Sequence, residues 1–181
     1  MSVLDAVLRR RSQPSVTENA PSHEQLLPLV AAAACVADHG SLRPWRLIEL
    51  RGEARERLGA AFAEASGAGI EDAKKLAGKA TRASLLIAVV AAFQPSPKVA
   101  DWEQEAVASG VAHTLSLLLD DAGWGVMWRT GHLTRSGAVR VMHGLAENEQ
   151  LLGWLYVGGR EGGEKPGERT MFPAEQHLSA L

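Results

Sequence analysis

The chain lacks several features that would assign it to a specialised class of protein. Its single cysteine, Cys35, has no second thiol for an internal disulfide, which suits a reducing compartment. The N-terminus lacks the basic and then apolar pattern of a signal peptide. The longest apolar run, Leu85 to Phe93, is far shorter than the ~20 residues that span a bilayer. A formal net charge of −2 gives no general attraction to nucleic acid or to an anionic membrane. These absences predict a cytoplasmic protein that binds neither nucleic acid nor membranes.

The usual motifs of metal-dependent, phosphate-loop and nucleophilic enzymes are also missing. The histidines are scattered without metal-ligand spacing: His23, His39, His113, His132, His143 and His177. The glycine pairs near the C-terminus lack a following helix and a Lys-Ser or Lys-Thr pair, and there is no G-x-S-x-G elbow. Cys35 and His39 are the one conceivable nucleophilic pair, at four residues apart, but a helix should be ending there. The sequence therefore indicates no metal site and no strong catalytic dyad.

Length and patterning predict a single α+β domain over residues 1–181. A chain of 181 residues suits one domain, and 46% apolar with 22% charged residues is ordinary for a globular protein. Apolar periodicity and capping residues predict helices over 1–8, 22–34, 53–66, 70–79 and 101–121, and a short one that begins at Thr134 or Ser136 and ends at Met142. Short apolar runs predict strands over 45–50, 85–90, 125–128 and 151–157. Because helices and strands do not alternate strictly, the pattern favours α+β over a parallel α/β sheet.

A basic cluster, Arg9-Arg10-Arg11-Ser12, follows the first predicted helix directly. Arginine presents a planar fork of donors that suits a phosphate group, and a serine hydroxyl adds one more contact. The alternative is a solvated charge run at a helix C-terminus, where cations are favoured. Taken alone, the cluster leaves both interpretations open.

Two later segments join this cluster in an order that resembles a known family. A loop with His39 leads through Pro44 and Trp45 into the strand over 45–50, and Trp128-Arg129-Thr130-Gly131 follows a later strand. The ordered set resembles the nitroreductase family of FMN-dependent oxidoreductases, and most of all its short, single-domain bacterial members. The Trp102-Glu103-Gln104-Glu105 helix start and the strand over 153–158 look like the same subfamily. The resemblance covers residues 4–159.

The resemblance assigns the basic cluster a role in cofactor binding. In the family this segment holds the phosphate and ribityl chain of FMN, so Arg10, Arg11 and Ser12 are expected to do so here. Arg9 is expected to be solvated. Many family members carry Lys or Arg near the flavin two residues after the Arg-Ser pair, where this chain has Pro14.

The other two segments are expected to contact the flavin itself. The loop before Pro-Trp reaches the flavin of the partner subunit in such dimers, which points to Cys35 and His39; a loop histidine bonded to backbone is the alternative. Trp128, Arg129 and Thr130 match a segment beside the cofactor. A fixed positive charge of Arg129 near the pyrimidine edge would stabilise the anionic reduced flavin and raise its potential.

The resemblance implies an activity and an assembly. The expected fold is nitroreductase-like, with a central, mostly antiparallel sheet flanked by helices, in an intertwined homodimer whose C-terminal tail (158–181) packs on the partner. NADPH or NADH would deliver hydride to flavin N5, and the reduced flavin would reduce a nitro-aromatic, quinone or related small-molecule acceptor in a ping-pong cycle. A non-catalytic flavin-storage protein and a cofactor-free dimeric interaction module are the alternatives.

Two departures from the family pattern bear on these roles. The loop has Asp38 and His39 where the family often has Ser and Asn, and either this change or Pro14 would weaken flavin binding or alter the substrate. A stretch sometimes assigned to the nicotinamide cofactor carries Asp120 and Asp121 here, whose negative charges would repel a pyrophosphate. That stretch is therefore not counted as a binding segment.

Overall fold

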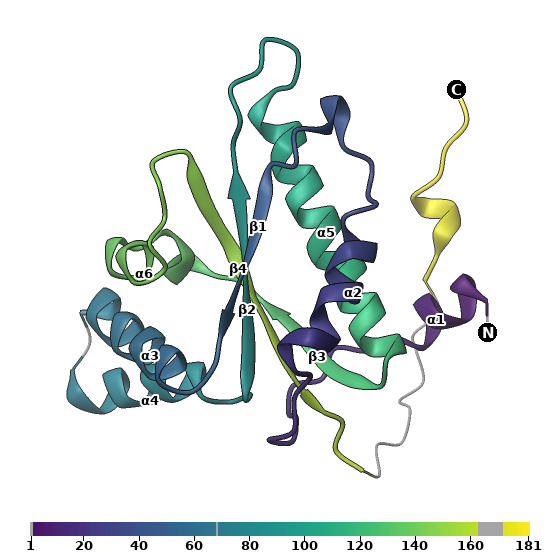
Figure 1. The fold of residues 1–181 in the computed structure, drawn as a ribbon. Helices are drawn as coiled ribbons and strands as arrows, with labels where there is room; N and C mark the ends of the chain where they lie inside the picture. The colour runs from purple at the N-terminus through teal and green to yellow at the C-terminus, as the bar shows by residue number, and fades with distance from the viewer. Residues whose placement is uncertain (1, 68, 163–171) are drawn as a thin grey trace.

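The strands form one antiparallel sheet with helices on both of its faces (Figure 1). The computed structural model describes residues 2–67, 69–162 and 172–181. The strands, in sheet order, are β1 (Trp45–Leu50), β2 (Leu85–Ala92), β4 (Glu149–Gly159) and β3 (Trp124–Arg129). The helices are α1 (Val3–Arg9), α2 (His23–Ala33), α3 (Glu53–Ser66), α4 (Ile70–Ala80), α5 (Asp101–Asp121) and α6 (Gly137–Met142). Short 3-10 turns lie at His39–Ser41, His132–Arg135 and Ala174–Gln176. Each neighbouring pair of strands is antiparallel, so the predicted α+β fold is confirmed.

Local sequence signals account for where the first helices begin. The Ser2 hydroxyl accepts a hydrogen bond from the Asp5 N–H, and the Asp5 carboxylate accepts one from the Ser2 N–H. Ser22 and Gln25 make the same reciprocal arrangement at the start of α2. Such capping boxes satisfy backbone donors that a helix cannot satisfy internally. Helix α2 then continues through Pro28 to Ala33.

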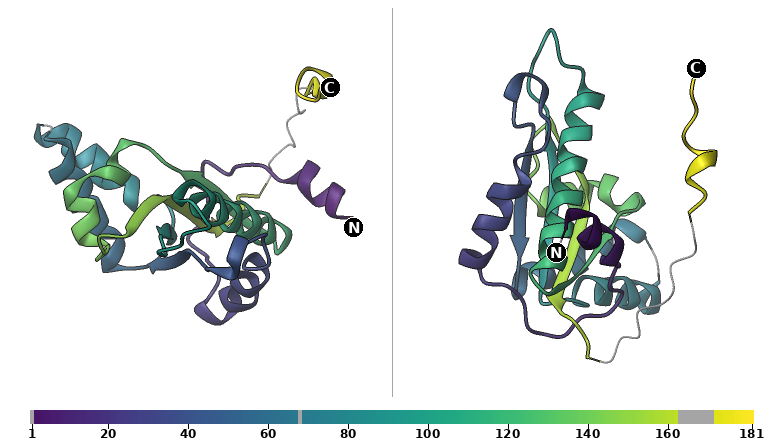
Figure 2. Two further views of the ribbon diagram at one scale, coloured as in Figure 1. Left: turned by 90° about the horizontal axis from the view of Figure 1, so that it is seen from above. Right: turned by 90° about the vertical axis from the view of Figure 1, so that its right-hand side faces the viewer.

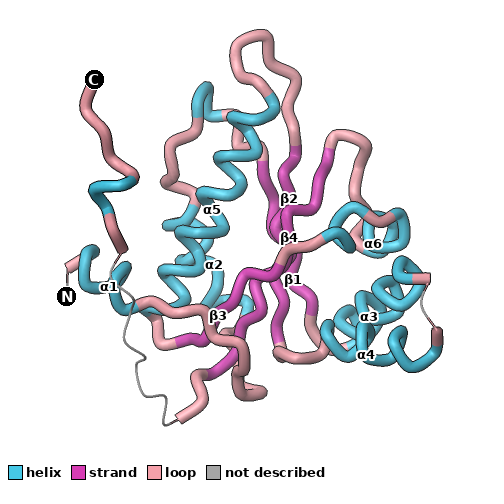
Figure 3. The backbone as a smooth tube through the Cα atoms, turned by 180° about the vertical axis from the view of Figure 1, so that it is seen from behind, coloured by secondary structure: helices cyan, strands magenta, loops and turns pink. Residues whose placement is uncertain are grey.

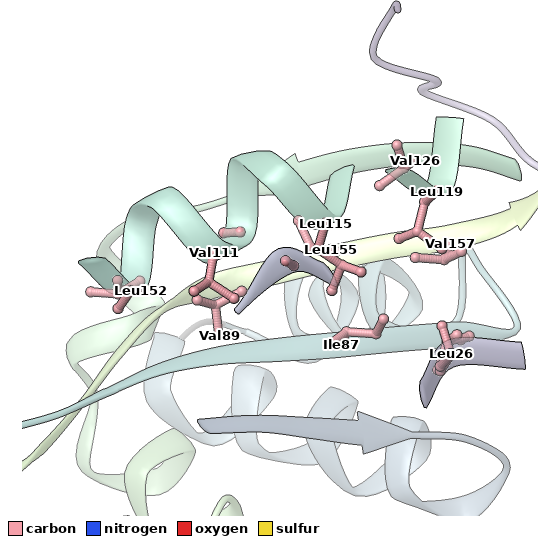
Figure 4. Close-up of a cluster of buried hydrophobic side chains, with 14 of the residues drawn as sticks. Leu26, Ile87, Val89, Val111, Leu115, Leu119, Val126, Leu152, Leu155 and Val157 are labelled. Carbon is pink, nitrogen blue, oxygen red and sulfur yellow. The ribbon is translucent and has the colours of Figure 1, made fainter. Parts of the chain in front are cut away.

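The sheet separates two hydrophobic cores. On one face, α5 packs on β2 and β4, where Leu115 and Leu119 meet Ile87, Leu155 and Val157 (Figure 4). On the other face, side chains of α3 and α6 pack against alternate residues of the same strands, with Phe62 edge-on to Trp154 at 5.2 Å between ring centroids. Figure 3 shows α2 and α5 on one side of the sheet and α3, α4 and α6 on the other. Alternating side chains of a strand face opposite ways, so each central strand serves both cores.

The N-terminal segment after α1 crosses the edge of the sheet at β3. The Gln13 N–H donates to the Val126 carbonyl at 3.0 Å, and the Thr17 N–H donates to the Gly159 carbonyl at 2.8 Å. Gly158 permits this crossing, because a Cβ there would lie 2.5 Å from the Thr17 carbonyl oxygen. The segment thereby brings the residues after α1 alongside β3.

The predicted start of the C-terminal tail was wrong by two residues. Strand β4 runs to Gly159 because Gly158 and Gly159 still pair with Gly125 and Trp124 of β3. Residues 172–181 stand apart from the body of the domain (Figure 2), and 163–171 lie outside the described residues. Among the described helices, none is long and apolar enough to cross a membrane.

Candidate functional site

Strand β3 forms the edge of the sheet, and a cavity lies on each side of it. Its successive side chains point to opposite faces: Trp128 packs toward α5 with the first core, whereas Arg129 lies over Tyr156 on the other face. Trp128 lines both cavities. The end of β3 is therefore the place where the two cavities meet.

The large cavity, of about 540 Å³, lies between the β3–β4 end of the sheet and helices α3 and α4. Aromatic and cationic side chains line it together. The aromatic members are Phe62, Trp128, Trp154 and Tyr156, and the cationic members are Lys79, Arg82 and Arg129. The described residues that line it include no carboxylate. Such a cavity suits a flat ring system that carries or gains negative charge.

Arg129 is held in place by two contacts. Its Nη2 donates to the Pro14 carbonyl at 3.2 Å, and its guanidinium carbon lies 5.1 Å from the centroid of the Tyr156 ring. Its buried Nε has no hydrogen-bond partner among the described residues, and neither has the buried Nε1 of Trp128. A buried donor without an acceptor is costly unless a ligand or water satisfies it. These two atoms therefore mark the end of β3 as a place for a ligand acceptor.

Two arginines oppose burial in setting the ionisation of Tyr156. Burial raises the pKa of the Tyr156 phenol, and the positive charges of Arg129 and Arg82 pull that pKa back down. The net direction is upward, so Tyr156 is a neutral phenol at physiological pH. It lines the large cavity as an uncharged aromatic side chain and adds no negative charge to it.

A buried histidine, His143, holds Trp154, one of the aromatic side chains of the large cavity. Trp154 donates its Nε1–H to His143 Nε2 at 3.0 Å, and His143 Nδ1 lies 2.8 Å from the Val139 carbonyl. These partners require the neutral tautomer with its proton on Nδ1. Burial, with the charge of Arg46 as a smaller cause, lowers the pKa of His143. The neutral imidazole thereby fixes the orientation of the Trp154 ring.

The small cavity, of about 240 Å³, lies on the α5 side of β3 and contains part of the basic cluster. Arg10 and Ser12 line it together with His113 and Ser116 of α5. His113 stands edge-on to Trp128 at 5.0 Å between ring centroids. The residues Arg10, Ser12 and Trp128, far apart in sequence, are thus brought together, and the donors suit a phosphate group.

The other two arginines of the cluster are used within the fold. Arg11 directs Nη1 at the carbonyls that end α1, the shortest distance being 2.8 Å to Leu8. Arg9 is exposed, as expected, and its Nη2 also lies 2.8 Å from Asp121 Oδ1 at the end of α5. The neighbouring Asp120 is buried and paired with Arg160 at 2.9 Å. The charges that were expected to repel a pyrophosphate are therefore paired with arginines.

Cys35 and His39 lie away from both cavities, near the start of α5. The exposed Cys35 thiol donates to the Ala31 carbonyl at 3.7 Å. His39 Nδ1 lies 3.0 Å from Glu103 Oε2, and this hydrogen bond lowers the pKa of Glu103. Asp38 accepts hydrogen bonds from the loop N–H groups of Leu42 and Arg43. His39 is therefore partnered by a carboxylate, and Cys35 and His39 do not form a nucleophilic pair.

Sequence reasoning did not identify several of the lining residues. Lys79, Arg82 and Tyr156 line the large cavity, and His113 lines the small one. Lys79 and Arg82 lie at the end of an ordinary polar helix, whereas Tyr156 and His113 belong to elements that serve the core. Only the pairing of β3 with β4 and the packing of α4 bring these residues together, and no local spacing encodes either contact.

Comparison with known proteins gives a consistent result. The nitroreductase family matches residues 7–159. The chain is 35% identical over 161 residues to "Putative NAD(P)H nitroreductase YdjA" of Escherichia coli K12, covering 87% of this chain and 88% of that protein. It is 30% identical over 162 residues to "Putative NAD(P)H nitroreductase" of Haemophilus influenzae, with the same coverage.

Solved structures share the fold at lower identity. A nitroreductase-like family protein from Bacillus cereus superposes with a TM-score of 0.87 at 21% identity, over 100% of this chain and 96% of that one. The FMN and NADPH-dependent nitroreductase NfnB from Sphigopyxis sp. strain HMH superposes with a TM-score of 0.76 at 17% identity, over 100% and 99%. At these identities the likeness establishes the fold alone.

Proposed function

Because this chain belongs to the nitroreductase family, we propose that it is an FMN-dependent oxidoreductase that uses NADH or NADPH to reduce nitro-aromatic, quinone or related acceptors. One observation carries the proposal: Trp128 stands between a small cavity with phosphate-binding donors and a large aromatic and cationic cavity. FMN has the same two parts, a phosphate on a flexible chain and a flat ring that becomes anionic on reduction.

The described residues fit FMN at both ends. Arg10 and Ser12 would hold the phosphate, because a guanidinium and a hydroxyl donate to phosphate oxygens. Trp128, Arg129 and Thr130 would lie beside the ring, where the unpartnered Nε of Arg129 and Nε1 of Trp128 could each meet a polar atom of it. When bound, FMN supplies the redox chemistry, taking hydride from a nicotinamide and passing the electrons to the acceptor.

Arg129 is the residue that would tune this chemistry. Its guanidinium contacts the carbonyl of Pro14, the position at which many relatives in the family carry Lys or Arg. A cation from β3 would therefore replace the cation missing from the N-terminal segment. Held in a partly buried cavity, it would favour the reduced and negatively charged ring over the neutral oxidised one.

The aromatic side chains of the large cavity would exclude water from the reacting face of the flavin. Trp154 is fixed by Phe62 and His143, and Tyr156 is fixed beneath Arg129. Rigid apolar walls lower the local dielectric, which strengthens the effect of the Arg129 charge. No side-chain acid is needed for hydride transfer itself, because the flavin carries the redox chemistry.

We further propose that the working unit is a homodimer. Large apolar side chains stand exposed on the single chain at both ends and at the start of α5, among them Val3, Leu4, Trp102, Phe172 and Leu178. Exposed apolar patches of this kind mark interaction surfaces. In a dimer Cys35 and His39 would approach the flavin of the other subunit. Sedimentation should give a dimer, and a flavin-loaded monomer would contradict the assembly.

The test of function is a visible absorption spectrum before and after anaerobic NADPH or NADH. The purified or reconstituted protein should show an oxidised flavin spectrum that bleaches rapidly, and acid should release FMN. Bound FMN that is not reduced would indicate a storage protein. A colourless protein that ignores added FMN would indicate an interaction module, and stoichiometric FAD would contradict the cofactor assignment.

A further inference from the structure

A third cavity, of about 350 Å³, adjoins the large one, and Arg82 lines both. It lies where the end of α4 and the start of β2 meet the first turn of α3 and the N-terminal segment. Its walls are mainly polar, and we call it the polar cavity. The members used below are Thr17, Glu18, Arg55, Thr81, Arg82 and Ser84. A ligand that extends out of the large cavity past Arg82 would enter it directly.

Two guanidiniums supply the cationic donors of the polar cavity. Arg55 Nη1 donates to the Ala83 carbonyl at 2.7 Å, which anchors the side chain, yet its buried Nε has no hydrogen-bond partner among the described residues. The exposed Arg82 makes no hydrogen bond or ion pair within the described chain. An anchored guanidinium with an unused donor beside a second, unengaged guanidinium is an arrangement that suits a phosphate group.

Of the remaining hydroxyls, those of Thr81 and Ser84 are engaged within the fold, and that of Thr17 is left as a neutral donor beside the arginines. The hydroxyl of Thr81 donates to the Gly78 carbonyl at 3.2 Å, and that of Ser84 donates to the Glu18 carbonyl. Both protons are therefore used within the fold. Glu18 is the one carboxylate among the described lining residues, and its side chain is exposed. Two positive charges thus face one negative charge, which leaves an excess that attracts an anion.

We propose that the polar cavity binds a phosphate group of the nicotinamide dinucleotide that donates electrons in the neighbouring large cavity. The inference rests on the proposed function, since it needs the flavin ring in the large cavity. The phosphate could be the 2′-phosphate that distinguishes NADPH from NADH or part of the pyrophosphate that both share. In either case Arg55 and Arg82 hold it, and the nicotinamide end lies past Arg82.

The experiment uses the dimeric, FMN-loaded protein with three variants. Arg55→Gln changes the polar cavity alone, Arg82→Ala changes the residue shared by both cavities, and Arg57→Ala removes an exposed cation of α3 that lines neither. Calorimetry with adenosine 2′,5′-bisphosphate and with 5′-AMP measures binding independently of turnover. Stopped-flow reduction gives the apparent affinity for NADPH and for NADH. Far-ultraviolet circular dichroism and FMN content report folding and cofactor loading of each variant.

Loss of one charge-assisted contact should weaken phosphate binding about tenfold or more. A 2′-phosphate site predicts this loss for NADPH and the bisphosphate with NADH unchanged; a pyrophosphate site predicts it for both dinucleotides. Glu18→Gln should act in the opposite direction and tighten binding, which a merely damaged fold would not do.

Three outcomes would overturn the inference. The first is that Arg55→Gln and Arg82→Ala bind NADPH, NADH and the bisphosphate as tightly as Arg57→Ala does. The second is loss of FMN from folded Arg55→Gln with donor affinity kept, which would assign the polar cavity to the flavin phosphate. The third is failure of the wild type to bind the bisphosphate or 5′-AMP. A wild type that holds no FMN, or is not reduced, contradicts the proposed function instead.

Discussion

The central strand β2 and the edge strand β3 serve opposite purposes in this molecule. Residues 85–91 of β2 are buried without a break, between β1 and β4 and under helices on both faces. In β3 only Gly125 and Val126 are fully buried, and cavities lie on both faces at its end. The side chains of the central strand pack in the two cores. The edge strand instead has two polar atoms, the Nε1 of Trp128 and the Nε of Arg129, without a hydrogen-bond partner among the described residues.

This difference shows why the site lies at an edge. A strand covered on both faces offers no room for a ligand, and a polar side chain there would lose more in desolvation than it gains. At β3, a cavity separates the end of the strand from helices α3 and α4, and the N-terminal segment supplies Arg10, Ser12 and the Pro14 carbonyl from a different part of the chain. Substitutions in the centre should therefore cost stability, and substitutions at the edge should cost binding and redox properties.

The largest effect should come from the centre. Leu115 of α5 is completely buried against the sheet, so Leu115→Ala removes apolar contacts and leaves a cavity. Such substitutions cost about 2–5 kcal/mol of unfolding free energy. Urea denaturation should show this loss, while the folded fraction still binds FMN with near wild-type affinity. A loss below about 1 kcal/mol would show that the core repacks.

The next effect should appear at the small cavity of the edge. Arg10→Ala should weaken FMN by about tenfold to a hundredfold, because one charge-assisted contact with phosphate contributes about 1.5–3 kcal/mol. Circular dichroism should be unchanged, and fluorescence titration of the apoprotein with FMN measures the affinity.

Arg9→Ala is the matched control for Arg10. It removes an exposed ion pair with Asp121, and such pairs contribute little to stability. A larger loss of FMN in Arg9→Ala than in Arg10→Ala would show that the assignment of the phosphate-binding arginine is off by one residue.

The same contrast explains what the sequence could predict. Capping pairs such as Ser22–Gln25 and the apolar run of β2 are local signals, and the structure has the elements they predict. The exposure of Arg9 was predicted, but its ion pair with Asp121 was not, because the two residues are 112 positions apart in the sequence. The large cavity depends on pairing between distant strands and on where α4 ends, and neither is encoded in a short spacing. The residue types of Arg10, Ser12 and Arg129 indicated a site for an anionic ligand, but only the fold showed that these residues lie together with Trp128 at the end of β3.

A smaller effect, on potential more than on affinity, should separate Arg129 from Arg10. Arg129→Ala should lower the midpoint potential of the flavin by a few tens of millivolts, since about 30 mV corresponds to about 1.4 kcal/mol for a two-electron couple. Reduction by NADPH or NADH should slow, and FMN affinity should fall less than in Arg10→Ala. Arg129→Lys should recover only part, because a point charge does not reproduce the planar fork. An unchanged potential in the alanine variant would remove Arg129 from the flavin site.

The smallest effect should be a pH dependence of stability caused by His143, a buried residue that also holds Trp154 of the large cavity. His143 is neutral in the folded protein because burial lowers its pKa below the ordinary value of 6.5. The unfolded chain therefore binds more protons as the pH falls below about 6.5, and stability should fall with it. The slope approaches about 1.4 kcal/mol per pH unit at most, and the loss between pH 7 and pH 6 is under about 1 kcal/mol.

The variant His143→Gln isolates this effect. A glutamine carbonyl can still accept from Trp154 Nε1 but does not titrate, so the variant should lose the part of the pH dependence that His143 causes. Urea denaturation from pH 7 to pH 5 measures the difference between the variant and wild type, in which the other titrating groups cancel. The same protonation would remove the acceptor of Trp154, so the wild type should also show a change in flavin fluorescence in acid that the variant lacks. Equal slopes of unfolding free energy against pH in the two proteins would mean that protonation of His143 neither destabilises the fold nor moves the Trp154 ring.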